Sequence, residues 1–470
     1  MKSARDLAIV DGRRMSHEII YPRDGGVQSF WIAPDGTLPP MLARARGVEV
    51  FDASGRRYLD VTAGPAAVNL GHGNERVLAA MREQAVRATF AYPSSFVSEA
   101  NLRLGAALRD LAGPPFEHAF FVSSGSEAVE KCLQFARRHA LATGQPQRHQ
   151  VISRNPCYHG STVATMALSA DPVYAAYLGS HAGVTHVNAP WSYRVPDGIS
   201  PEMHADECAE ALRAAIVGLG PDSVLAFIIE PVMGFCGGAT FAPPGYYRRI
   251  REICDEFGVL LIFDETISGS GRTGRFLAAA NWPDGRPDLV VLAKGLGSGY
   301  YPLAAFLAPA PMVELVARNG GFHLGHTYKA NPLGCAVADA VLDELVAGRL
   351  MDRATQRGQY LRDRMRHACR NNVLVGDVRG MGLLNAVEIV ADRETRAMLP
   401  RKLDVLGRVK SLALSRGLLI YGRRTHGGRF GDWIMLTPPL IVSEAELDEM
   451  VDGLAATLAD YERELAASRG

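Results

Sequence analysis

The sequence predicts an α/β fold in which a large domain with a mostly parallel, seven-stranded sheet is joined to a smaller α+β domain. Short apolar runs alternate with amphipathic stretches from about residue 118 to residue 309. Several runs are continuously apolar, which is typical of strands that crossover helices bury on both faces. After Asn331 and Pro332 the pattern changes to long amphipathic segments and short, separated strands. This change indicates a second structural unit.

The expected strands of the large sheet are the seven apolar runs 118–122, 150–154, 184–188, 224–229, 259–263, 289–293 and 303–307. Helices are expected between them, because parallel strands need long crossover connections. One helix is predicted over 127–140, after the capping box Ser124-x-x-Glu127. A second is predicted over 246–257 and ends at Gly258, a residue suited to a left-handed cap.

The chain after residue 332 is expected to form the smaller domain. It is predicted to begin with a helical region over 333–369, followed by strands within 373–390, around Arg379-Gly-Met-Gly382. A helix over 402–415 and two strands, 418–421 and 433–436, come next. The last element is a helix behind Ser443-x-x-Glu446. The first 70 residues, with short strands near 48–52 and 57–60, are expected to pack with this domain. The predicted boundaries are therefore 1–70, 71–332 and 333–470.

The composition argues against several classes of partner. Fifty basic and fifty acidic residues give a net charge of zero, which offers no electrostatic footprint for nucleic acid or an anionic membrane. The apolar run 224–229 is far shorter than the roughly 20 residues that cross a bilayer. Asp6 and Asp11 make the first 15 residues unlike a secretory signal or a transit peptide. Seven cysteines without a C-x-x-C pair favour free thiols in a reducing cytoplasm, so we expect a cytoplasmic protein.

Residues with chemical potential follow the predicted strands at their carboxyl ends, where ligands bind in open α/β sheets. They are Ser123-Ser-Gly-Ser126, Tyr158-His159-Gly160, Glu230-Pro231, Asp264-Glu265 and Lys294-Gly295. The loop Ser124-Gly125-Ser126 joins a strand to a helix, so its N–H and hydroxyl groups can receive an anion. Lys294 is one of only six lysines and lies behind an apolar strand. Partial desolvation there would lower the pKa of its amine and make it a Schiff-base nucleophile.

Each of these features alone also has an ordinary structural explanation. The serine loop can be a helix cap, Lys294 a surface residue, Asp264 a cap at the edge of the core, Tyr158 a packing residue and Glu230 a loop acid. Together they supply a lysine, an anion cradle, a ring for stacking and a carboxylate. These four groups are what pyridoxal 5'-phosphate (PLP) requires.

Two other motifs predict different chemistry. The loop from Gly269 to Gly274 reads G-x-G-x-x-G, which would suit a nicotinamide dehydrogenase, but the segment behind it is too short for a crossover helix. The pair His323-x-x-His326 lacks a third ligand, so we expect no metal site. A catalytically silent relative that acts through binding is a further alternative, disfavoured because lysine, aspartate and phosphate loop are all present.

In their order and separation the motifs resemble the class III (subgroup II) aminotransferases of PLP fold type I, from about residue 48 to residue 439. The motifs are residues 47–60, Leu70-Gly-His72, Ser124-Gly-Ser-Glu-Ala128, Tyr158-His-Gly160, Glu230-Pro231, Gly237-Gly238, Pro243-Pro-Gly-Tyr246, Asp264-Glu265, Gly271-Arg-Thr-Gly274, Lys294-Gly295, His326-Thr-Tyr328, Arg379-Gly-Met-Gly382 and Pro438-Pro439.

The resemblance implies a role for each matching residue. Lys294 would form the Schiff base and later move the proton between the substrate Cα and the cofactor, while Asp264 would pair with the pyridine nitrogen. Thr327 would reach the phosphate of the neighbouring subunit in a homodimer or a dimer of dimers. The cofactor site implied in this way comprises Ser124, Gly125, Ser126, Tyr158, His159, Glu230, Asp264, Thr266, Lys294 and Thr327.

Departures from the family pattern bear on the substrate. Thr266 replaces the family's usual valine. The aromatic residue that is common near the Gly64-Pro-Ala-Ala67 stretch in pyruvate-using members is missing, which suggests a roomier or differently shaped pocket. The Gly-Glu-Gly-Gly of the 4-aminobutyrate and ornithine branch becomes Gly234-Phe-Cys-Gly-Gly238, which speaks against that branch's dual-substrate switch. A carboxylate-binding arginine is expected before Pro438. The candidates for this role are Arg423, Arg424 and Arg429.

We therefore expect a PLP-dependent transaminase that moves an amino group from an amine or amino acid to a 2-oxo acid through pyridoxamine phosphate. Pyruvate is expected as the acceptor in preference to 2-oxoglutarate. An aminomutase of the glutamate-1-semialdehyde type, a decarboxylase or a racemase remains the alternative, because Lys294 and Asp264 would serve all of them equally.

Overall fold

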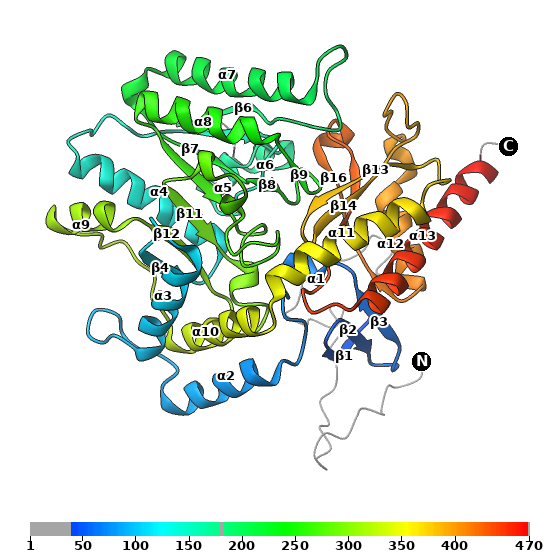
Figure 1. Ribbon diagram of the computed structural model, residues 1–470, viewed down its shortest axis with the longest axis horizontal. Coiled ribbons are helices and arrows are strands. Elements are labelled where there is room, and N and C mark those ends of the chain that lie inside the picture. Colours follow the sequence, from blue (N-terminus) through cyan, green and yellow to red (C-terminus); the bar gives the residue numbers. More distant parts are fainter. Residues whose placement is uncertain (1–38, 179–182, 469–470) are drawn as a thin grey trace.

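A seven-stranded sheet forms the centre of residues 39–178 and 183–468, the part of the chain that this computed structural model describes (Figure 1). Its strands, in spatial order, are β4 (His118–Val122), β12 (Ala304–Ala308), β11 (Leu289–Leu292), β10 (Leu260–Asp264), β7 (Val224–Ile229), β5 (Gln150–Asn155) and β6 (Val184–Asn188). Strand β12 is antiparallel to both neighbours and all other pairs are parallel. The predicted sheet is confirmed, with strand ends within one residue of their expected positions.

Helices cover both faces of this sheet, which explains its continuously apolar strands. Strand β7 is buried throughout: Phe227 and Ile229 face one core, and Leu225 and Ile228 face a second. The helices of the described residues are α1 (Ala63–Ala66), α2 (Glu75–Arg87), α3 (Glu99–Ala112), α4 (Gly125–Ala142), α5 (Val163–Leu168), α6 (Pro172–Leu178), α7 (Pro201–Leu219), α8 (Pro244–Phe257), α9 (Ala310–Arg318), α10 (Pro332–Ala347), α11 (Leu350–Ala368), α12 (Val405–Ser415) and α13 (Glu444–Ala467).

The predicted helix caps are present. Ser124 caps α4 and accepts a hydrogen bond from the backbone N–H of Glu127, whose carboxylate accepts one from the N–H of Ser123. Helix α8 ends at Gly258, which adopts the left-handed conformation with φ of 63°. Ser443 and Glu446 form the reciprocal capping box at the start of α13.

A second, antiparallel sheet lies beside the first (Figure 1). Its strands, in spatial order, are β13 (Val375–Met381), β14 (Leu384–Ile389), β17 (Asp432–Leu436) and β16 (Tyr421–Arg424). Helix α11 contacts β13, and α12 contacts β16 and β17. The helical region expected over 333–369 consists of two helices, α10 and α11, because the chain turns at Gly348 and Arg349, where Arg349 has a φ of 48°.

The amino-terminal strands belong to a third sheet that also includes a strand from the carboxyl-terminal region. Its strands are β1 (Leu42–Arg46), β2 (Glu49–Asp52), β3 (Arg57–Asp60) and β15 (Leu418–Leu419). Leu59 of β3 pairs in parallel with Leu418 of β15. The domain boundaries 1–70, 71–332 and 333–470 stay predictions, and the expectation for the first 15 residues lies outside the described residues.

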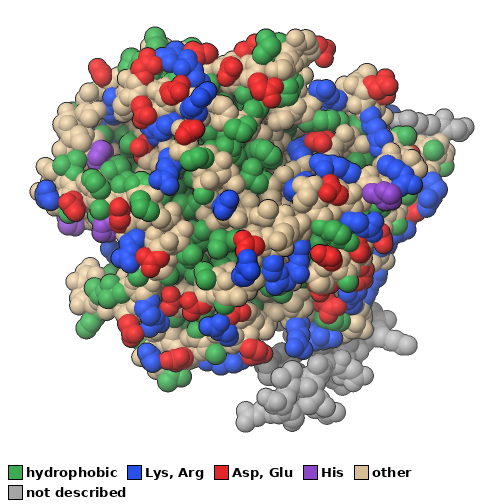
Figure 2. Space-filling model, viewed as in Figure 1, with side chains coloured by type: hydrophobic (Ala, Val, Ile, Leu, Met, Phe, Trp, Pro, Cys, Tyr) green, Lys and Arg blue, Asp and Glu red, His purple; other side chains and the backbone are tan. Residues whose placement is uncertain are grey.

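The surface, the helices and the cysteines bear on the classes of partner and compartment considered from the composition. On the face drawn in Figure 2, basic and acidic side chains lie interspersed. None of the helices in the described ranges is long and apolar enough to cross a membrane. All seven cysteines lie in the described part of the chain, where each is a free, buried thiol.

Candidate active site

A cavity of about 410 Å³ lies at the carboxyl ends of the parallel strands. Residues of the predicted cofactor set meet here although they are up to 170 positions apart, from Ser124 to Lys294. The lining residues are Ala67, Ser123, Ser124, Gly125, Ser126, Tyr158, His159, Gly160, Glu230, Asp264, Thr266, Ile267, Ala293, Lys294, Gly299, Tyr301, Pro302 and Leu303. The sheet thus gathers nine of the ten predicted cofactor residues around one cavity, Thr327 being the exception.

Asp264, the last residue of β10, is held on both of its carboxylate oxygens. His159 donates from Nδ1 to Oδ2 across 2.9 Å, and the backbone N–H of Thr266 donates to Oδ1 across 3.1 Å. Burial opposes a charged imidazole, but the neighbouring Cys157 and the hydrogen bond to Asp264 outweigh it and raise the pKa of His159 to about 10. A protonated His159 supports an anionic Asp264, because the two charges attract inside a site of low dielectric.

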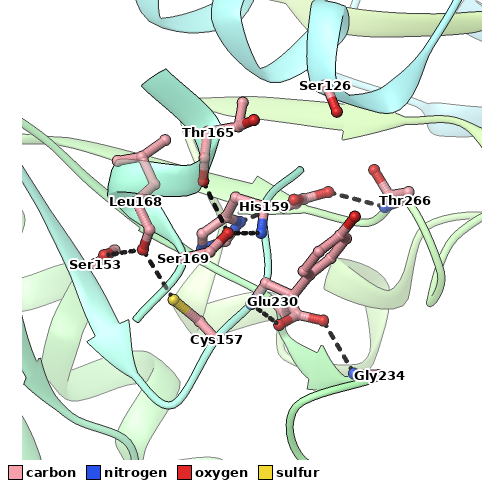
Figure 3. Close-up of polar contacts among 12 residues, drawn as sticks. Ser126, Ser153, Cys157, His159, Thr165, Leu168, Ser169, Glu230, Gly234 and Thr266 are labelled. Atoms are coloured by element: carbon pink, nitrogen blue, oxygen red, sulfur yellow. Dashed lines mark hydrogen bonds and ion pairs between the residues drawn. The ribbon is translucent and has the colours of Figure 1, made fainter. Parts of the chain in front are cut away.

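The opposite side of His159 is anchored by its backbone. Its N–H donates to the hydroxyl oxygen of Ser169 across 2.8 Å, and that hydroxyl in turn donates to the carbonyl of Thr165 (Figure 3). Within the described ranges, the buried Nε2 of His159 has no hydrogen-bond partner. The hydrogen bond from Nδ1 to Asp264 and the anchored backbone therefore orient the imidazole.

Lys294 follows β11 in a short turn and has a φ of 40°, an unusual value for a residue with a side chain. Its amine lines the cavity, 5.0 Å from the centre of the Phe235 ring. Burial lowers the pKa of Lys294, and the carboxylates of Asp264 and Glu230 offset this only in part. A larger fraction of the amine is therefore neutral than in water, and the neutral form is the nucleophilic and basic one.

The amino terminus of α4 forms an open cradle at the other end of the cavity. Gly125 is the first helical residue, and a Cβ on it would lie 3.3 Å from the methyl group of Thr266 and 3.4 Å from the Cβ of Ala293. The hydroxyl oxygen of Ser126 accepts a hydrogen bond from the N–H of Ser161 across 3.1 Å. Free N–H groups and the positive end of the helix dipole make this cradle suitable for a phosphate.

Glu230 organises the backbone around the cavity. One carboxylate oxygen accepts from the N–H of Tyr158 and the other from the N–H of Gly234, both across 3.0 Å (Figure 3). Burial raises the pKa of Glu230, while the charge of His159 and these N–H groups lower it. Its two hydrogen bonds fix the position of Tyr158, whose ring lines the cavity, and of the hairpin that begins at Gly234.

The candidate arginines do not line this cavity. Arg423 is paired with the buried Asp171, and Arg424 donates to the carbonyl of Leu399. The guanidinium of Arg429 lies over the ring of its neighbour Phe430, 5.3 Å from the ring centre. Their assignment to the substrate carboxylate stays a prediction. Ala67, which is predicted to shape the substrate pocket, lines the cavity, and its contact with the substrate also stays a prediction.

Thr327 lies on the surface, away from the cavity of its own chain. Glu265, next to Asp264, also points elsewhere: its carboxylate accepts hydrogen bonds from the N–H groups of Ala278 and Ala279 across 2.5 and 2.8 Å. Burial raises the pKa of Glu265 to about 8. Of the predicted Asp264-Glu265 pair, only Asp264 therefore faces the site.

The G-x-G-x-x-G loop has a structural role. No helix able to receive a dinucleotide follows it among the described residues; the next element is a single 3-10 turn, Ala278–Asn281. Its buried Arg272 donates to the carbonyl of Pro438 across 2.5 Å and to the side chain of Asn69 across 2.6 Å. Likewise, no three His, Cys, Asp or Glu side chains of the described ranges are grouped so that they could hold a metal ion.

Sequence reasoning missed one side of the cavity, formed by Ile267, Gly299, Tyr301, Pro302 and Leu303. The last three precede β12, which runs antiparallel to its neighbours, so its amino end reaches the same sheet edge as the carboxyl ends of the others. The glycine-rich run behind Lys294 was the available signal, because glycines permit close approach of backbone to a ligand.

Comparisons with known proteins agree with this geometry. The family model described as aminotransferase class-III matches residues 32–458. The putrescine--pyruvate aminotransferase of Pseudomonas aeruginosa is 32% identical over 416 residues (87% of this chain, 88% of the relative). The diaminobutyrate--2-oxoglutarate transaminase of Halomonas elongata is 32% identical over 422 residues (87% and 88%). A leucine/methionine racemase of Thermococcus litoralis is 32% identical over 432 residues (91% and 92%). The structure of the omega transaminase from Pseudomonas jessenii in complex with PMP superposes with a TM-score of 0.85 at 32% identity, covering 92% of this chain and 94% of that one.

Proposed function

This chain belongs to the class-III aminotransferase family, and from that premise we propose that it transfers an amino group from an amine or amino acid to pyruvate. As a member of this family it is a PLP-dependent enzyme of fold type I. The observation that carries the proposal is the meeting of Lys294, Asp264 and the α4 cradle around one cavity. The three groups come from separate strand ends of a single sheet.

The residues of the cavity fit the cofactor. The glycine at position 125 keeps the α4 cradle open, because any side chain there would press on Thr266. The N–H groups at the start of α4 would hold the phosphate, Asp264 the pyridine nitrogen, and Tyr158 one face of the ring. When bound, PLP supplies a cationic ring that stabilises negative charge developing on the substrate carbon.

The chain's own residues perform two tasks around that ring. Burial lowers the pKa of Lys294 and so favours its neutral amine, which can take a proton from the substrate Cα at its Nζ and return a proton later. Asp264 keeps a fixed negative charge in place, because His159 and the N–H of Thr266 hold both of its oxygens. A carboxylate held in this way stabilises a proton on the facing nitrogen by a charge-assisted hydrogen bond, generally about 1.5–3 kcal/mol.

The lining of the cavity supports a small acceptor. Its apolar and aromatic lining includes Ala67, Ile267, Tyr301, Pro302 and Leu303. Among the described residues of this chain, no arginine lines the cavity, so the second carboxylate of 2-oxoglutarate would find no guanidinium here. The similarity to a putrescine--pyruvate aminotransferase supports the same choice, and the similarity to a diaminobutyrate--2-oxoglutarate transaminase supports the other acceptor.

We also propose that the enzyme is a homodimer whose subunits complete each other's site. Large apolar side chains are exposed between residues 86 and 97, namely Val86, Phe90, Tyr92, Phe96 and Val97. Tyr328, in a distant loop, is also exposed, and its ring lies 5.8 Å from that of Phe90. Monomeric proteins rarely expose such groups together. Thr327, adjacent to Tyr328, would then lie at the interface and reach the partner's phosphate cradle.

The proposed function is tested by incubating the cofactor-loaded enzyme with a panel of amines and amino acids, with and without an external 2-oxo acid. We expect the spectrum of the cofactor to change with the donor alone, and alanine to accumulate only when pyruvate is added. Continued turnover of an amino acid without any oxo acid would refute the transaminase. Loss of optical activity under that condition would instead favour a racemase, as the similarity to a leucine/methionine racemase suggests.

A further inference from the structure

An aromatic ring is held next to the reactive amine by the hairpin between β8 (Val232–Met233) and β9 (Thr240–Phe241). Phe235, at the tip of this hairpin, is buried and has its ring centre 5.0 Å from the Nζ of Lys294. At this separation the electron-rich face of a ring attracts an ammonium ion. The charged groups that influence the pKa of this amine are the carboxylates of Asp264, at the end of β10, and Glu230, which follows β7.

The second sheet of the protein grips the base of this hairpin. Arg379 of β13 donates from Nε to the carbonyl of Gly238 across 2.7 Å and from Nη2 to the carbonyl of Gly237 across 3.2 Å. Gly238 has a φ of 54°, and a Cβ on it would lie 2.6 Å from the indole of Trp433. Gly238 thus lets the hairpin approach Trp433 and Arg379 closely enough for both hydrogen bonds.

Two carboxylates, one of them fully buried, fix the arginine itself. Nη1 of Arg379 lies 2.5 Å from a carboxylate oxygen of Glu388, which is fully buried on β14, and 3.0 Å from one of Asp377. Glu388 is bound on its other oxygen by Arg194, at 2.6 Å. Arg379 therefore has little freedom, and it transmits its position to the hairpin through two carbonyl groups.

Other contacts hold the ring of Phe235 from its remaining sides. The ring of Tyr421 lies 4.8 Å away and the ring of Tyr158 6.4 Å away, centre to centre. At the start of the hairpin, the N–H of Gly234 donates to Glu230. The position of the ring relative to Lys294 is therefore determined by contacts from the seven-stranded sheet region and from the antiparallel sheet that contains β13 and β16.

We propose that Phe235 tunes the proton affinity of Lys294 and that Arg379 is the positioning residue that keeps the ring in place. The inference rests on the proposed function in one respect, that Lys294 is the amine that moves protons. Burial favours the neutral amine, whereas the ring favours the ammonium form that the amine becomes when it accepts a proton. The two influences together keep Lys294 able both to take a proton and to release it.

The test is the pH dependence of Lys294 acetylation by acetic anhydride in the full-length protein freed of cofactor, followed by mass spectrometry of the Lys294 peptide. Phe235→Leu should lower the midpoint of this titration by about half a pH unit or more, because the ammonium loses the ring. Arg379→Lys should shift the midpoint in the same direction, since lysine keeps the charge beside Glu388 but cannot bind both carbonyl groups. The double variant should shift it no further than Phe235→Leu alone.

A matched control separates positioning from general damage. Phe241→Leu removes a ring from the same hairpin, and in the described part of the chain Phe235 makes its ring contacts with Tyr421 and Tyr158 rather than with Phe241. This variant should leave the midpoint unchanged. In the cofactor-loaded enzyme, the acid limb of the pH–rate profile should move to lower pH in Phe235→Leu and Arg379→Lys alone.

An unchanged midpoint in Phe235→Leu would overturn the proposal, as would an equal shift in Phe241→Leu or additive shifts in the double variant. The acetylation midpoint is measured without substrate, so it does not depend on the proposed reaction. A shifted midpoint together with failure of every amine and oxo acid would refute the transaminase and retain the role of Phe235. An unchanged midpoint together with turnover of an amine and an oxo acid would refute the role of Phe235 and retain the transaminase.

Discussion

His159 donates a hydrogen bond to Asp264 across 2.9 Å, and the exposed fractions of the two side chains are 0% and 3%. A buried carboxylate is costly unless charge or hydrogen bonds compensate it. Here a histidine with a raised pKa supplies both, and the N–H of Thr266 supplies a further hydrogen bond. These hydrogen bonds hold the Asp264 carboxylate at the cavity, where it would pair with the protonated pyridine nitrogen of the cofactor.

Replacing Asp264 with asparagine should reduce the rate and leave the fold intact. The substitution keeps the shape but removes the charge, and a lost charge-assisted hydrogen bond of about 1.5–3 kcal/mol corresponds to a roughly 10- to 150-fold decrease in kcat/KM. Steady-state kinetics with the best amine and pyruvate measure the decrease in kcat/KM, and circular dichroism monitors the fold. An unchanged rate would mean that the anion is not anchored at Asp264.

Replacing Lys294 with alanine should abolish turnover, because the group that moves the proton is gone. The cradle and Asp264 remain, so the variant should still bind the cofactor, now without a covalent bond. Borohydride treatment followed by mass spectrometry is the measurement: the cofactor's mass should stay on the Lys294 peptide of the wild type and be absent from the variant. Full activity of the variant would refute the assignment of Lys294.

Adding a methyl group at Gly125 should weaken cofactor binding. A Cβ there would meet Thr266 and Ala293 at 3.3–3.4 Å, and crowding of this kind typically costs about 1–3 kcal/mol, which is a roughly 5- to 150-fold rise in Kd. Fluorescence titration with PLP measures it. Gly218→Ala in α7 is the control, because a Cβ at Gly218 meets open space; equal effects in both variants would argue against a cradle at Gly125.

Glu265 should make the stability of the protein depend on pH. Its folded-state pKa, about 8, is above the ordinary value of 4.5 because of burial. Between these two values the folded chain holds a proton that the unfolded chain has lost, so this contribution to the free energy of unfolding decreases as pH rises from about 4.5 through about 8. Glu265→Gln should remove that dependence.

Urea unfolding at pH 5, 7 and 9 measures this contribution. The stability of the wild type relative to Glu265→Gln should fall by a few kcal/mol over the range. Glu207→Gln, on an exposed side chain of α7, should show no such trend. A constant difference between the wild type and Glu265→Gln across the three pH values would show that the carboxyl group ionises normally.

The strands of the large sheet were predictable because their signal is local. A run such as 224–229 is apolar at every position, and a strand covered on both faces has to be. Caps such as Ser124 and Gly258 are equally local, since each acts on the backbone within four residues. The turn at Gly348 and Arg349 inside the helical region 333–369 was not predicted, although Gly348, a residue typical of helix ends, was a local signal for it.

The sequence alone determined which chemical groups lie at the carboxyl edge of the sheet: Lys294, Asp264 and the serine loop follow strands, and strands of one parallel sheet end together. Only the tertiary structure decided how those groups are tuned. His159 and Asp264 are 105 positions apart, Phe235 and Lys294 are 59 apart, and Arg379 reaches Gly238 from a different sheet. Such contacts depend on how elements pack against one another, and the free energy of that packing comes from burial shared among many residues, which no local pattern encodes.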